Sequence, residues 1–111
     1  MSVKFLIRFI IKKKPMASIV SIAFPFRGSF HYVLVSEKEL NNQIHYRLTI
    51  MNGDLEKLLY GCNIISEVNG ELELDDCDGN FEKWELKKQI VTALSAHLNK
   101  KVIELPFTVS Q

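Results

Sequence analysis

Two histidines are the first residues in this chain whose type and spacing could do chemistry. Alternating apolar residues predict two neighbouring antiparallel strands, and His31 and His45 both fall on odd, outward positions of these strands. Two imidazoles on one face of a sheet could share a metal ion or a proton. A zinc or catalytic site needs a third ligand or an orienting acid, and the sequence places neither beside them. We therefore predict surface or interface histidines, no metal site and no catalytic residue.

An acidic stretch, Asp76 to Gly79 followed by Glu85, imitates part of a calcium loop. Its first ligand position would be Leu74, which has no carboxylate to anchor the ion. We expect these acids to belong to a loop that caps the following helix.

The two cysteines, Cys62 and Cys77, form no CxxC pair and no spacing typical of a zinc site. A secreted domain of this size usually carries more cysteines than two. We expect reduced thiols in a cytoplasmic protein, with a single disulfide between the two as the alternative.

The other polar residues form no recognisable catalytic set. No serine lies in a nucleophile elbow, and the five glycines are isolated, so a phosphate-binding loop has no local support. The sequence therefore offers no support for an enzyme, and no cofactor is predicted.

Charge is distributed unevenly along the 111 residues. Five of the 14 Lys and Arg residues precede Met16 and all 13 Asp and Glu residues follow it, so the chain from Met16 onward carries nine basic and 13 acidic side chains. Such an acidic body repels polyanions, which disfavours general binding of nucleic acid or anionic membranes by the folded part.

Residues 1–15 differ from the rest in composition. The apolar run Phe5 to Ile11 is interrupted by Arg8 and is too short to span a bilayer, which takes about 20 residues. We interpret residues 1–15 as an extension upstream of a true start at Met16. The alternative is a basic segment, residues 1–14, that lies on a membrane surface. Residues 16–111 are then one α+β domain.

The hydrophobic periodicity predicts an antiparallel sheet of five or six strands in hairpins, packed against one long C-terminal helix. An Asn-Gly pair at 52–53 predicts a turn, and a second at 69–70 predicts a hairpin. The expected strands are 19–26, 30–35, 44–50, 63–68, 71–74 and a short final strand within 102–109; the expected helices are a turn at 54–61 and a long helix from about 80 to 99 whose buried stripe includes His97.

The second strand has two apolar faces. We assign Phe30, Tyr32 and Leu34 to the core, because they continue the even pattern of the first strand, and the odd positions to the outer face. Residues 27–33 resemble the basic-glycine-aromatic strand of RNA-recognition motifs, where exposed aromatic rings stack on bases. The core assignment of the aromatic residues argues against that use here.

These observations predict a cytoplasmic, non-catalytic protein-interaction module, whose partner is a second copy or another protein. One alternative is a small-molecule-binding or enzymatic domain with a pocket between sheet and helix, near His31, His45 and Tyr46. Another is weak membrane-surface or nucleic-acid binding through the basic N-terminal segment. The candidate binding face consists of His31, Val33, Val35, His45 and Arg47.

Overall fold

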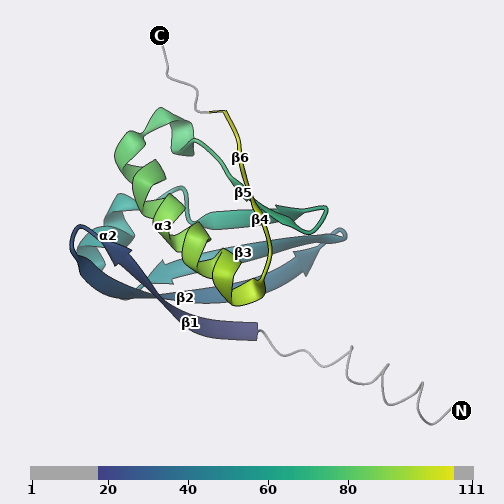
Figure 1. Ribbon diagram of the computed structural model, residues 1–111, viewed down its shortest axis with the longest axis horizontal. Helices are drawn as coiled ribbons and strands as arrows, with labels where there is room; N and C mark the ends of the chain where they lie inside the picture. Colours follow the sequence, from purple (N-terminus) through teal and green to yellow (C-terminus); the bar gives the residue numbers. More distant parts are fainter. Residues whose placement is uncertain (1–17, 107–111) are drawn as a thin grey trace, which may run out of the picture.

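Six strands form one sheet in the computed structural model, which describes residues 18–106, and their order in space is their order in the chain (Figure 1). The long helix α3 lies diagonally across one face of this sheet. The strands are β1 (Ser18–Phe26), β2 (Ser29–Leu40), β3 (Gln43–Ile50), β4 (Ile64–Val68), β5 (Glu71–Leu74) and β6 (Val102–Glu104). The helices are α2 (Gly53–Leu58), the 3-10 turn η1 (Cys77–Gly79) and α3 (Phe81–Leu98). The predicted α+β class, with one long helix and a short final strand, is confirmed.

Neighbouring strands from β1 to β5 pair antiparallel, and only the pair β5–β6 is parallel within the described residues. The parallel pair follows from α3, because a helix between two adjacent strands returns the chain to the same end of the sheet. The proposed extension at residues 1–15 and the end of the predicted last strand lie outside residues 18–106.

Our prediction that the even positions of β2 face the core is wrong. Val33 and Val35 are buried, whereas Phe30 and Tyr32 are 74% and 58% exposed. The cause is the two-residue turn Arg27–Gly28, both with positive φ, which pairs Phe26 with Ser29. Residues directly opposite each other share a face, so the buried even positions of β1 face odd positions of β2.

The second strand is longer than the predicted range 30–35, because β2 continues to Leu40 and turns only at Asn41–Asn42, where both residues have positive φ. At the predicted turn 52–53, Asn52 starts α2. Its side-chain oxygen accepts a hydrogen bond from the backbone N–H of Leu55 at 3.1 Å and so caps α2.

The second Asn-Gly turn is as predicted, and α3 begins and ends within one residue of the predicted range 80–99. Asn69–Gly70 joins β4 to β5 without a bulge, since Val68 pairs with Glu71. The Asn80 side chain accepts from the N–H of Lys83 at 3.1 Å, and Asn99 ends α3 in the left-handed conformation. His97, expected in the buried stripe, is exposed.

The core fills the space between α3 and the face of the sheet that α3 covers, which we call the inner face. It consists of apolar residues from every strand from β1 to β5 and from both helices; the most deeply buried are Phe24, Val33, Leu48, Leu59, Ile65, Leu72, Leu74, Leu86, Ile90 and Val91. Cross-strand alternation therefore leaves the opposite, outer face of the sheet without a covering element among residues 18–106.

Candidate functional site

The predicted binding face does not form one surface. His31, Val33 and Val35 lie on the inner side of β2, where both valines are in the core and the His31 ring lies 5.7 Å from that of Phe24. His45 lies on the other face, where its Nδ1 is 3.3 Å from the Ser66 hydroxyl. The two histidines therefore do not meet, because the register of the second hairpin, β2–β3, puts odd positions of β2 opposite even positions of β3.

Large apolar side chains instead lie on the outer face, which also carries Arg47. We define the outer apolar face as five residues that are between 41% and 74% exposed: Ile19, Phe30, Tyr32, Met51 and Ile64. Backbone pairing joins them across four strands. One row runs from Ile19 to Ile64 through Ser36 and Arg47, and Met51 donates its N–H to the carbonyl of Tyr32 at 2.9 Å. A patch of this kind is typical of an interaction surface.

The outer apolar face reaches the edge of the sheet at β1. Ala23 and Pro25 of β1 are exposed and lie opposite Tyr32 and Phe30. No strand within residues 18–106 pairs with the other side of β1, and its nine residues include no charged side chain. Soluble proteins usually guard edge strands with charges, bulges or short length, and β1 has only Pro25 near its end.

Two hollows border the inner face. Between the sheet and α3 is a cavity of about 120 Å³ beside Val35, Tyr46 and His97, well below the roughly 300–1,000 Å³ of drug-sized ligand sites. A more open hollow of about 410 Å³ lies at the turn Arg27–Gly28 beside Glu85. Of the three residues named for a pocket between sheet and helix, Tyr46 lines the smaller cavity, and His31 and His45 line neither hollow.

A polar network begins at Tyr46, which lines the cavity between sheet and helix. Tyr46 donates its hydroxyl hydrogen to Glu67 at 2.6 Å, and the ammonium of Lys100 donates to the same carboxylate oxygen at 2.7 Å. Burial raises the pKa of Tyr46, and its hydrogen bond to Glu67 raises this pKa further. Burial alone would also raise the pKa of Glu67, but the hydrogen bonds from Lys100 and Tyr46 outweigh it, so the pKa of Glu67 is lowered.

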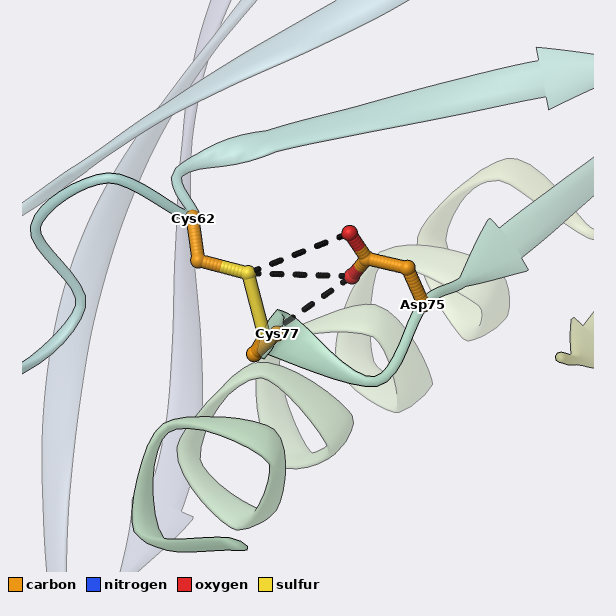
Figure 2. Close-up of side chains that lie close together, drawn as sticks. All are labelled: Cys62, Asp75 and Cys77. Atoms are coloured by element: carbon orange, nitrogen blue, oxygen red, sulfur yellow. Dashed lines mark hydrogen bonds between the residues drawn. A yellow bond between two sulfur atoms is a disulfide. The ribbon is translucent and has the colours of Figure 1, made fainter. Parts of the chain in front are cut away.

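A second polar cluster surrounds the cysteines, which we expected as reduced thiols. Cys62 and Cys77 instead form a disulfide that ties the turn after α2 to η1 (Figure 2). The side chain of Asp75 points at it, with Oδ1 at 3.7 Å from each sulfur. A disulfide sulfur carries no hydrogen, so these contacts become S–H···O hydrogen bonds only when the cysteines are reduced.

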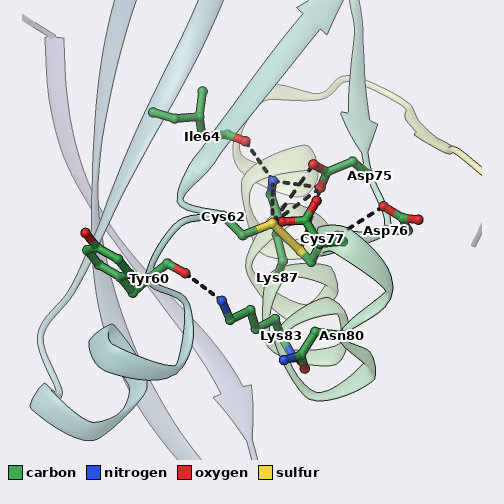
Figure 3. Close-up of a disulfide and its surroundings, with 10 residues drawn as sticks. Tyr60, Cys62, Ile64, Asp75, Asp76, Cys77, Asn80, Lys83 and Lys87 are labelled. Carbon is green, nitrogen blue, oxygen red and sulfur yellow. Dashed lines mark hydrogen bonds and ion pairs between the residues drawn. A yellow bond between two sulfur atoms is a disulfide. The ribbon is translucent and has the colours of Figure 1, made fainter. Parts of the chain in front are cut away.

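The buried ammonium of Lys87, on α3, completes this cluster (Figure 3). Its Nζ donates to Asp75 Oδ1 at 2.9 Å and to the carbonyl of Ile64 at 2.7 Å, and it lies 3.6 Å from Cys62 Sγ. The Lys87 side chain is 2% exposed, whereas that of Asp75 is 49% exposed. Ammonium groups are rarely this buried without a partner, and here the partners are a carboxylate, a carbonyl and a sulfur.

The atoms of Cys62, Asp75 and Cys77 lie within 4.8 Å of one another, the spacing of a metal centre. The Lys87 ammonium lies against two of them and supplies positive charge where an ion would bind. A disulfide also offers no thiolate, which is the form of cysteine that binds metals. As the cluster is arranged, thiol–disulfide chemistry fits these residues better than metal binding.

Lys87 was not among the site residues that we predicted from the sequence. The signal available was its spacing on α3, because Lys87, Val91 and Leu94 stand at i, i+4 and i+7 and all three are buried. Their helical arc is therefore part of the core, and a lysine within it requires a counter-charge.

No protein-family model, curated protein or solved structure matches this chain. Within the described residues, no helix has the length and apolar character required to cross a membrane.

Proposed function

We propose that this domain is a non-catalytic interaction module that associates with a second copy of itself through the β1 edge and the outer apolar face. The observation that carries the proposal is the position of exposed Phe30 and Tyr32 beside an edge strand without charges. Exposed aromatic residues are typical of the centres of protein interfaces.

Several features favour a second copy over another partner. Two copies of β1 can pair antiparallel about a twofold axis, which makes the contact self-complementary and closed. Such pairing satisfies the free backbone groups of β1 in both copies and joins the two outer apolar faces into one surface. The opposite edge of the sheet, β6, has only three residues, one of them Glu104, and so offers a much shorter ladder.

Sedimentation equilibrium of the full 111-residue chain tests the proposal. We expect a reversible dimer at micromolar concentration. Ala23→Lys places a charge on the outer side of β1, and Tyr32→Ser removes an aromatic ring beside it; each should raise the dimer dissociation constant at least about tenfold, equivalent to about 1.4 kcal/mol. Tyr60→Ser is the matched control, because Tyr60 is 80% exposed but lies after α2, away from the outer apolar face.

Three outcomes would overturn the proposal. One is a wild-type chain that stays monomeric at several hundred micromolar, and another is an equal effect of Tyr60→Ser. The third is a monomer that binds single-stranded RNA and loses this binding in Tyr32→Ser, which would make the face a base-stacking platform. Repeating the measurement with the chain started at Met16 identifies any contribution of residues 1–15.

A further inference from the structure

The buried ammonium of Lys87 lies beside the disulfide as well as beside its counter-charge, Asp75. Lys87 Nζ lies 3.6 Å from the sulfur of Cys62, and no contact of this kind is found between Lys87 and Cys77. The two sulfurs therefore differ in electrostatic environment once the bond between them is broken. Cationic neighbours of this kind favour the thiolate form of a cysteine.

The backbone around Cys77 is strained. Cys77, Asp78 and Gly79 have φ values of 51°, 59° and 77°, all in the left-handed region. For the two residues that are not glycine, this conformation is sterically unfavourable. The bond to Cys62 fixes one end of this turn, and the N-cap of α3 at Asn80 fixes the other. Breaking the disulfide frees the turn to relax, which favours reduction relative to a disulfide in unstrained backbone.

We propose that Cys62–Cys77 is a reversible thiol–disulfide redox centre, reduced by a dithiol, in which Lys87 makes Cys62 the thiolate of the reduced protein. Cys77 is 2% exposed, so the η1 turn must open before a thiolate of the dithiol attacks Cys77 Sγ; the bond between the two cysteines then breaks with its electron pair leaving on Cys62. The second thiol of the reductant then attacks the mixed disulfide, which releases Cys77 and closes a cyclic disulfide. Two electrons pass to the protein and the reductant is oxidised; its two protons go to Cys77 and to solvent.

The other charged groups near Cys62 do not cancel the effect of Lys87. Asp75 opposes a thiolate, but half of its side chain is exposed to water, which screens its charge more than that of buried Lys87. Asp76 accepts a hydrogen bond from the N–H of Asp78, and Lys83 donates to the carbonyl of Tyr60 at 2.7 Å.

The first test uses the intact protein and dithiothreitol at pH 7 without denaturant. We expect both thiols to form and the circular-dichroism spectrum of the folded protein to persist, and oxidised dithiothreitol to restore the disulfide. A disulfide that resists a large excess of dithiothreitol until the protein is denatured would overturn the proposal, because it would be a structural link only.

The second test identifies the thiolate by its absorbance at 240 nm, which does not depend on access by a reagent. In the Cys77→Ser variant, Cys62 should ionise with a midpoint at least about one pH unit below the usual value near 8.5. Adding Lys87→Gln should abolish this shift, and Lys87→Arg should preserve it. In the matched Cys62→Ser variant, the remaining Cys77 should show no such lowering.

Equal midpoints for the two single-cysteine proteins, or a Cys62 midpoint unchanged by urea denaturation, would contradict the role of Lys87. If Lys87→Gln does not fold, the comparison between Cys77→Ser and Cys62→Ser still decides the question.

Discussion

The two faces of the sheet differ in what covers them, although both are apolar where β1, β2 and β3 meet. On the inner face Phe24 and Val33 are completely buried in the core. On the outer face of the same hairpin, Phe30 and Tyr32 are mostly exposed. The free energy of burial stabilises the fold through the first pair, whereas the second pair can contribute only when another surface covers it.

The largest expected difference between the faces is in stability. Phe24→Ala should lower the free energy of unfolding by about 3–5 kcal/mol, because it leaves a cavity in the core. Phe30→Ala should change it by less than about 0.5 kcal/mol, as at other surface positions. Urea denaturation at low micromolar protein, where association contributes little, measures both. Similar losses for the two variants would contradict the assignment of faces.

A smaller difference in the free energy of unfolding is expected when carboxylates on the two faces of the hairpin β4–β5 are replaced. Glu67 lies on the inner side with Tyr46 and Lys100, and Glu67→Gln should cost about 1–2 kcal/mol at pH 7. Glu71→Gln, on the outer side, should cost less than about 0.5 kcal/mol.

The Glu67 contribution should also depend on pH. The pKa of Glu67 is lower in the folded protein than its ordinary value of 4.5, so the carboxylate stabilises the fold above pH 4.5. This stabilisation is lost as the pH falls through the folded-state pKa. In urea denaturation between pH 7 and pH 3, the loss of free energy of unfolding caused by Glu67→Gln should become smaller as the pH falls. A loss that is constant with pH would contradict a stabilising role of the ionised Glu67 carboxylate.

Local patterns predicted the elements of the fold well. Alternation located β3, the Asn-Gly pair located the turn between β4 and β5, and the apolar helical periodicity located α3 to within one residue at each end. These features can be predicted from the sequence because each depends on residues close together in the chain.

The faces and the cysteine cluster could not be predicted in the same way. Which face of β2 is buried depends on the two-residue turn Arg27–Gly28, because this turn places even positions of β1 opposite odd positions of β2. The burial of Lys87 depends on Asp75, twelve residues earlier, and on contacts that form only after α3 packs on the sheet. The Cys62–Cys77 disulfide likewise requires α2 and η1 to meet in the folded chain.

Amide hydrogen exchange of the full chain at low and high protein concentration tests the central claim most directly. If a second copy pairs with β1, exchange in Ser18–Phe26 should slow as concentration rises through the dimer dissociation constant, while exchange in β6 and α3 stays unchanged. Exchange in β1 that is independent of concentration, or protection that appears over α3 instead, would contradict an interface on this edge and the outer apolar face.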